Sequence, residues 1–171
     1  MKMNKAINIA LLRSRSTWRF ITQILSILAI SIVLSASLSV VIAQSSNDQK
    51  AQAAIRAVLD AQAAAWNRGE LETYMDGYAR SDNTVFVSGD RVTRGWQTVL
   101  ERYKKAYDSR DKMGVLTFSD VEITVLSKDA AIVLGRWHLQ RSKDEPHGRF
   151  TLLFRKTNAG WKIVHDHTSS A

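Results

Sequence analysis

Four alternating segments in the second half of this chain constrain its fold more than any other feature. Side chains of a β-strand point to opposite faces with a period of two, and each of these segments largely follows that period. The segments span residues 115–126, 131–140, 150–156 and 161–169. Turn sequences or one polar loop separate them, so we expect four long antiparallel strands.

The first of these strands changes register. Leu116 and Phe118 are apolar at even positions, whereas Val121 and Ile123 are apolar at odd positions. A β-bulge near residues 119–120 would reconcile the two halves and would curve the sheet. Gly135 in the next strand indicates a bend or another backbone passing close.

Helical patterns dominate residues 45–108. A helix is expected from the N-cap candidates at 45–48 to about Arg68, because its apolar residues recur at spacings of three and four. A short second helix follows, then a hairpin over 84–94 and a third helix to about residue 108. The charged face of the third helix, which includes Arg102, is predicted to be solvated.

This order of elements predicts an α+β fold. We expect a strongly curved antiparallel sheet wrapped around three helices from the N-terminal half, which together form a cone. A curved sheet lined with large aromatic residues cannot close fully on a helix, so a cavity is expected at the wide end.

The final strand carries the most informative polar residues. Strict alternation places Trp161, Ile163, His165 and His167 on one face and Asp166 on the other. An apolar strand face that becomes polar toward one end is typical of a ligand pocket. The complete predicted pocket consists of Gln62, Trp66, Tyr74, Tyr78, Trp96, Tyr103, Trp137, His165 and His167. Gln62 interrupts the apolar stripe of its helix. Three interpretations are open: a boundary residue that reaches solvent, a buried amide with hydrogen-bond partners, or a hydrogen-bonding group of the pocket.

Three motifs resemble a known family. They are Ala65-Trp66-Asn67-Arg68-Gly69-Glu70-Leu71, Gly95-Trp96 at the start of a helix, and Gly160-Trp161-Lys162-Ile163-Val164-His165-Asp166-His167-Thr168-Ser169. Together they resemble the SnoaL-like, or ketosteroid-isomerase-like, branch of the nuclear transport factor 2-like superfamily, over about residues 50–169.

The resemblance implies a cone fold, often a homodimer packed through its sheets, and a pocket at the open end. Equivalents of Trp66, Tyr78, Trp96, Trp137 and His167 would line that pocket. Relatives include isomerases, dehydratases, cyclases, epoxide hydrolases and non-catalytic association domains, so the fold alone does not give the function.

Within the predicted pocket, His167 is the candidate general acid or base, because histidine titrates near neutral pH. The alternative is that both histidines only stabilise the end of the strand. Ketosteroid isomerase uses a carboxylate base with a tyrosine and a protonated acid. The sequence does not supply that set, since Asp166 is expected on the face opposite the histidines.

A metal or other cofactor is not expected. His165 and His167 form a pair on one strand face, but a catalytic zinc needs three protein ligands and no third is evident. The sequence has no glycine-rich phosphate loop, serine nucleophile motif or dinucleotide-binding fingerprint, and no cysteine.

Residues 1–43 predict export. Five basic residues and no acidic ones precede or flank an uncharged run from Phe20 to Ala43. A small residue at the end favours a cleaved signal peptide, whereas the length of the run also suits an uncleaved membrane anchor. Either way, a short linker over 44–49 would lead to a single domain over 50–171 that is periplasmic or secreted.

The remaining residues have an ordinary charge balance. Of the 24 basic residues, 19 follow residue 43, against 16 acidic residues, so the net charge of +8 falls to +3. This composition does not indicate nucleic-acid binding. We expect a small apolar or amphipathic ligand and a homodimer, with membrane contact only through an uncleaved N-terminal segment. The chain is either a small-molecule-binding domain with isomerase- or lyase-type chemistry, or a non-catalytic accessory or oligomerising module.

Overall fold

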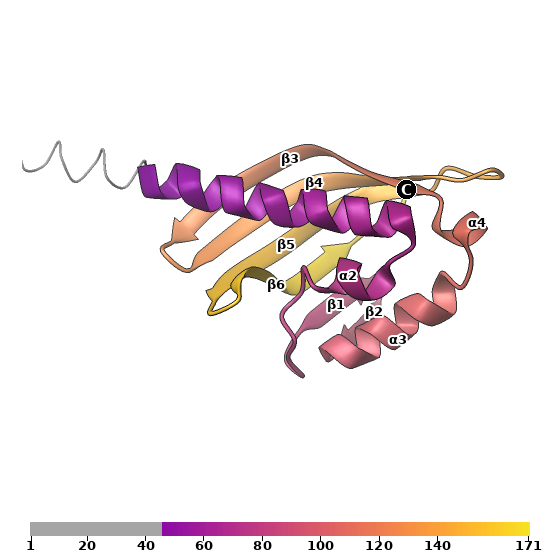
Figure 1. The fold of residues 1–171 in the computed structure, drawn as a ribbon, viewed down its shortest axis with the longest axis horizontal. Coiled ribbons are helices and arrows are strands. Elements are labelled where there is room, and N and C mark those ends of the chain that lie inside the picture. The colour runs from indigo at the N-terminus through magenta and orange to yellow at the C-terminus, as the bar shows by residue number, and fades with distance from the viewer. Residues whose placement is uncertain (1–45) are drawn as a thin grey trace, which may run out of the picture. The chain divides into compact units, whose positions relative to one another are not determined.

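A long amphipathic helix covers residues 46–68 in the computed structural model of the protein, which describes residues 46–171 (Figure 1). Its buried side presents Ile55, Leu59, Gln62 and Trp66 at helical spacing. Gly69, at φ +85°, ends the helix, and the Gly69 and Glu70 amides donate to the Trp66 and Ala65 carbonyls. Residues 46–49, expected to belong to a linker, are therefore helical.

The remaining elements follow the predicted order, with one addition. The helices are α2 (Leu71–Met75), α3 (Trp96–Ala106) and α4 (Arg110–Met113), and the strands are β1 (Val85–Ser88), β2 (Arg91–Arg94), β3 (Val115–Ser127), β4 (Ala130–Gln140), β5 (His147–Thr157) and β6 (Gly160–Thr168). Helix α4 is a single turn, too short to leave a periodic apolar pattern in the sequence.

The six strands form one curved, open sheet in the order β2-β1-β6-β5-β4-β3. The long strands β3 to β6 pair antiparallel, as expected, through short connections. The sheet is antiparallel as expected, except that strand β1 pairs in parallel with β6. This pairing joins segments about 80 residues apart, so no hairpin turn in the sequence could indicate it.

Bulges curve two of the strands. The predicted bulge in β3 is confirmed by a register shift between Ser119 and Glu122, where Asp120 adopts φ 49°. The other bulge lies in β6, because Ile163 pairs with Phe154 whereas His165 pairs with Leu153. Val164 is thus an extra residue, and side chains after it reverse their faces.

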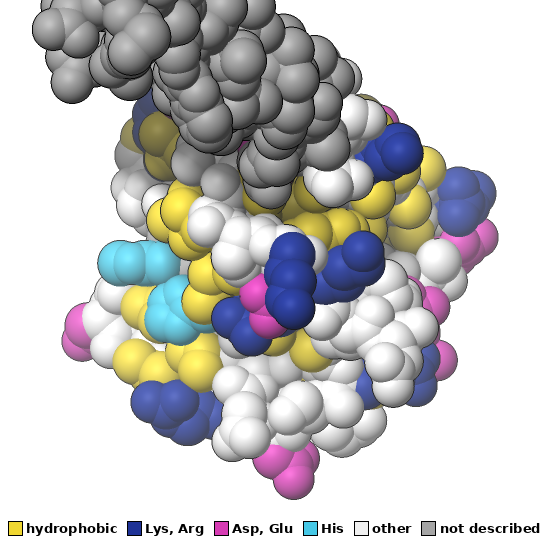
Figure 2. Space-filling model, turned by 90° about the vertical axis from the view of Figure 1, so that its left-hand side faces the viewer, with side chains coloured by type: hydrophobic (Ala, Val, Ile, Leu, Met, Phe, Trp, Pro, Cys, Tyr) yellow, Lys and Arg dark blue, Asp and Glu magenta, His cyan; other side chains and the backbone are white. Residues whose placement is uncertain are grey.

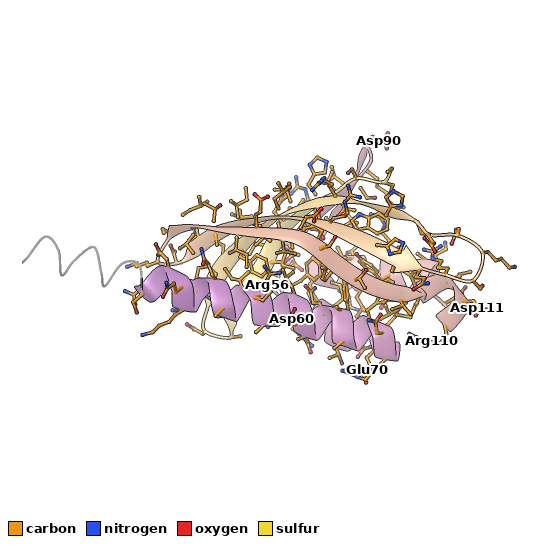
Figure 3. All side chains as sticks on the ribbon, turned by 90° about the horizontal axis from the view of Figure 1, so that it is seen from above. Arg56, Asp60, Glu70, Asp90, Arg110 and Asp111 are labelled. Carbon is orange, nitrogen blue, oxygen red and sulfur yellow. The ribbon has the colours of Figure 1, made fainter. Side chains whose placement is uncertain are left out.

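The N-terminal helix and α4 are tied to each other and to β3. Arg110 donates to the carbonyls of Trp66 and Asn67 at 2.9 and 2.8 Å, which places a cation at the C-terminal end of the helix (Figure 3). The Asn67 side chain accepts from the Leu116 amide and donates to its carbonyl. These contacts hold the helix across the sheet and above the concave face.

Gly135 permits close packing within the sheet. A Cβ atom at this position would overlap the ring of Phe150 on the neighbouring strand β5. The sequence indicated a bend or another backbone at this position, whereas the close neighbour is an aromatic side chain.

Within residues 46–171, no helix combines the length and hydrophobicity needed to cross a bilayer. The signal peptide or anchor expected over residues 1–43 lies outside the described part of the chain.

Candidate functional site

A cavity of about 170 Å³ lies between the helices and the concave side of the sheet. Six of the nine predicted pocket residues line it: Gln62, Trp66, Tyr74, Tyr78, Tyr103 and Trp137. The cavity is also lined by residues that the sequence analysis did not assign to the pocket, chiefly Phe86, Arg102, Phe118, Phe150 and Asp166. The site is therefore an aromatic chamber with a small number of polar groups.

Trp66 stands at the centre of the aromatic wall. Its ring makes edge contacts with Tyr74, Tyr103 and Tyr107, at centroid distances of 5.2, 6.0 and 4.7 Å. Its indole nitrogen donates to the carbonyl of Met113 at 3.1 Å. Because both its ring and its polar atom are engaged, Trp66 gives the cavity a fixed wall.

Gln62 is a buried amide with a partner. It is 2% exposed, and its Nε2 donates to the carbonyl of Tyr74 at 3.1 Å. Of the three alternatives, the structure excludes the solvent-reaching boundary residue. The side chain lines the cavity while it joins the N-terminal helix to α2.

Asp166 is the principal acidic group of the cavity. It is 4% exposed, and each of its carboxyl oxygens accepts a hydrogen bond: Oδ2 from Tyr78 at 2.7 Å and Oδ1 from Thr168 at 2.9 Å. Burial raises the pKa of Asp166 to about 6, although both hydrogen bonds favour the ionised form. The group therefore titrates close to neutral pH.

The neighbouring tyrosines remain protonated over the physiological pH range. Burial, reinforced by the charge of Asp166, raises the pKa of Tyr74 and Tyr78 well above the ordinary value. Their rings lie next to each other, with centroids 6.1 Å apart. The cavity thus places a carboxyl group beside phenolic hydroxyls that can act as hydrogen-bond donors.

The two histidines lie outside the cavity, and the expectation that they face inward is wrong. His167 is exposed and His165 is partly exposed, on the outer side of the sheet. The bulge at Val164 reverses the faces, so Asp166 and Thr168 point inward in their place. Histidine side chains lie at the surface beside hydrophobic ones in Figure 2.

Trp96 also lies outside the cavity lining. Its indole nitrogen donates to the carbonyl of Met75 at 2.8 Å, and the guanidinium of Arg80 sits 4.4 Å from its ring centroid. Trp96 therefore anchors the start of α3 to the end of α2.

Arg102 corrects the expectation that its helix face is solvated. Its guanidinium lies 5.1 Å from the centroid of Phe86 and donates to the Thr93 hydroxyl at 3.0 Å. These contacts turn the side chain across β1 and β2, where it becomes part of the cavity lining. Its long aliphatic stem allows the charged end to reach this position from a surface helix.

A curved open sheet that closes an aromatic cavity against helices defines the class of nuclear transport factor 2-like cone proteins. The chain belongs to the SnoaL-like domain family, whose sequence model matches residues 55–171. This membership confirms the resemblance and the cone fold deduced from the sequence.

Solved structures agree with this assignment. A nuclear transport factor 2-like protein of unknown function from Shewanella oneidensis is 42% identical, with a TM-score of 0.67 over 69% of this chain and 98% of that chain. A ketosteroid isomerase-like protein from Erwinia carotovora is 21% identical, with a TM-score of 0.56 over 69% of this chain and 94% of that chain.

A third structure, a putative calcium/calmodulin dependent protein kinase II association domain from Xanthomonas campestris, is 17% identical, with a TM-score of 0.56 over 68% of this chain and 85% of that chain. The Erwinia and Xanthomonas structures share the fold alone. No curated protein matches this chain.

Proposed function

We propose that the chain is an exported domain that binds a small, largely apolar molecule in its aromatic cavity and moves a proton on that molecule through Asp166. The observation that supports this most strongly is the buried carboxyl group, which faces the cavity and accepts a hydrogen bond from Tyr78. The reaction class is an isomerisation or elimination that begins with removal of a proton next to a carbonyl group.

The electrostatics of the site suit such a step. A general base works best when its pKa lies near the working pH, and burial brings the pKa of Asp166 to about 6. The Tyr74 hydroxyl keeps its proton, so it can stabilise negative charge on a substrate oxygen. The Tyr78 hydroxyl donates its single proton to Asp166 and holds the base in place. Strict strand alternation had placed the carboxyl group of Asp166 on the outer face of the sheet, away from these tyrosines.

The size of the cavity limits the substrate. A volume of about 170 Å³ is close to that of an engineered cavity of about 150 Å³ that holds benzene. Pockets for drug-sized ligands are larger, at about 300–1,000 Å³. We therefore propose a substrate with one ring or a short branched chain, smaller than a steroid.

Proton exchange on a simple ketone tests this function without knowledge of the substrate. Cyclohexanone has one ring and exchangeable protons beside its carbonyl group, and their replacement by deuterium can be followed by NMR. We expect the purified chain to accelerate the exchange, and Asp166→Asn to reduce this acceleration by about 10²-fold or more.

His167→Ala is the matched control, because it removes a titratable group from the same strand but from its outer face. The His167→Ala protein should exchange the protons of cyclohexanone at the wild-type rate. Equal rates for wild type and Asp166→Asn, or a rate reduced only by His167→Ala, would refute the proposed role of Asp166.

A second candidate, a non-catalytic oligomerising module, is favoured by the outer face of the sheet. Ile132 and Leu134 on β4 are 39% and 40% exposed there. Ile132 pairs with Leu153, which pairs with His165, so apolar side chains and a histidine form a row across three strands. We propose that two copies pack through this face.

Light scattering on the purified chain tests the dimer. Ile132→Lys combined with Leu134→Lys should convert a dimer into a monomer, because two charges would face the partner without counter-charges. If these substitutions leave the mass in solution unchanged, the outer face is not the interface. Proton exchange on cyclohexanone by the wild type would identify a catalytic dimer, whereas a dimer without this activity would be a purely structural module.

Export is proposed from residues 1–43 alone, where a basic segment precedes a long uncharged run. Mass spectrometry of the protein isolated from cells would give the N-terminus of the mature chain. A mature chain that begins near residue 44 identifies a cleaved signal, and a full-length chain in the membrane fraction identifies an anchor.

A further inference from the structure

We infer that the ligand of the cavity is a small carboxylic acid whose carboxylate is bound by Arg102. This inference rests on the proposed binding function of the cavity and adds the chemical class of the ligand. It makes Arg102 a specificity-determining residue.

Arg102 is held in place but keeps most of its hydrogen-bonding capacity. A guanidinium group has five N–H donors, and the structure gives this one a single hydrogen bond, from Nη1 to the Thr93 hydroxyl. The ring of Phe86 supports it at 5.1 Å. Among residues 46–171, no carboxylate forms an ion pair with Arg102, whereas other arginines, such as Arg68, Arg80 and Arg155, each have an acidic partner.

A second arginine strengthens the positive charge on this side of the cavity. The guanidinium of Arg141 lies 6.0 Å from the ring centroid of Tyr107, a cavity residue, and its Nε atom is buried with no hydrogen-bond partner in the described structure. Burial raises the pKa of Tyr107, and the charges of Arg141 and Arg102 oppose this rise. The carboxylate of Asp144 lies 3.7 Å from Nη1 of Arg141, so the ion pair involves this nitrogen and not the buried Nε atom.

The acidic residue of the cavity is not paired with this charge. Asp166 is the only carboxyl group among the residues that line the cavity, and it is paired with Tyr78 and Thr168. No ion pair joins Arg102 to Asp166 in the described structure. The cavity therefore contains two different polar groups, a guanidinium suited to bind an anion and a carboxyl group suited to exchange a proton.

The remaining space favours a carboxylate as the anion. A single ring fills a cavity of about this volume, so the anionic group must be compact and lie at the edge. The planar fork of an arginine matches a carboxylate with two parallel hydrogen bonds. Ser88 and Ser170, which also line the cavity, offer further hydroxyl donors.

Benzoate and benzamide, which differ in charge but have nearly the same shape, test this inference. Trp66 and Trp137 line the cavity, so quenching of tryptophan fluorescence in the full-length chain reports binding. We expect benzoate to bind about tenfold or more tightly than benzamide, because hydrogen bonds to charged groups are the stronger ones. Arg102→Gln should abolish this preference while the affinity for benzamide is retained.

Arg80→Gln is the matched control, because Arg80 also lies over an aromatic ring, that of Trp96, but outside the cavity lining. It should keep the wild-type preference, and Arg102→Lys should keep part of it. Equal affinities of the wild type for both probes, or an unchanged preference in Arg102→Gln, would overturn the inference and leave the cavity as a binding site for neutral molecules. If neither probe binds the wild type, the proposed binding function falls as well.

Discussion

Replacement of Asp166 by asparagine should stabilise the protein at neutral pH but not in acid. The carboxyl group has a pKa of about 6 in the folded chain, against 3.8 without burial. Each tenfold change in proton affinity corresponds to about 1.4 kcal/mol, so the ionised form costs the folded state about 3 kcal/mol.

The direction of the effect follows from proton binding. Below about pH 4 the carboxyl group is protonated in both folded and unfolded chains, and it causes no penalty. Between about pH 4 and pH 6 the unfolded chain loses this proton first, so the wild type loses stability as pH rises. Above about pH 6 the full cost is present and stays constant.

Asparagine removes this cost and keeps the geometry. Its amide oxygen can accept from Tyr78, and its NH₂ group can donate to the Thr168 hydroxyl, which lies 2.9 Å from the carboxylate in the wild type. The stability of Asp166→Asn relative to the wild type should therefore rise by about 3 kcal/mol from acid to neutral pH.

Urea unfolding of both proteins at several pH values, with equal ionic strength, measures this difference. Asp90→Asn is the control, because Asp90 is exposed at the tip of the β1–β2 turn (Figure 3). Its stability difference from the wild type should not change by more than a few tenths of a kcal/mol. A difference between wild type and Asp166→Asn that is the same at all pH values would refute the reasoning.

Three further substitutions test the site and the fold. Tyr78→Phe should raise the pKa of Asp166 above about 6, because the hydrogen bond that it removes favours the ionised carboxylate. NMR titration of the Asp166 carboxyl carbon measures this pKa, and an unchanged value would contradict the assigned role of the hydrogen bond. Gly135→Ala should lower the free energy of unfolding by about 1–3 kcal/mol, since its methyl group would overlap the ring of Phe150; unchanged stability would argue against that packing. His167→Ala should change stability by no more than about 0.5 kcal/mol in urea unfolding, and a larger loss would mean that the imidazole is not at the surface.

The sequence predicted one bulge and missed the other for a definite physical reason. In β3, apolar residues stand on both sides of the bulge, so Leu116 and Val121 reveal the change of face by themselves. In β6, the apolar residues end at Ile163 and Val164, and only polar residues follow. Histidine and aspartate are equally polar, so alternation alone could not show which of them turns inward.

The aromatic part of the cavity could be predicted from the sequence because it depends on helix periodicity. Trp66, Tyr74 and Tyr103 lie on the apolar sides of their helices, and all three line the cavity. The place of Arg102 in the cavity could not be predicted, because a charged residue on the polar side of a helix normally faces solvent. Only the packing of α3 against β1 and β2 shows that its guanidinium reaches the chamber.

The extra residue at Val164 decides which side chains of β6 face the cavity. If the strand lost its bulge but kept Val164, strict alternation would bring His165 and His167 to the interior and send Asp166 to the exterior. Deletion of Val164 would instead remove the bulge and the extra residue together, and Asp166 would still face inward. Among proteins of this fold, the backbone irregularity of the last strand would then be as informative as the residues that the strand carries.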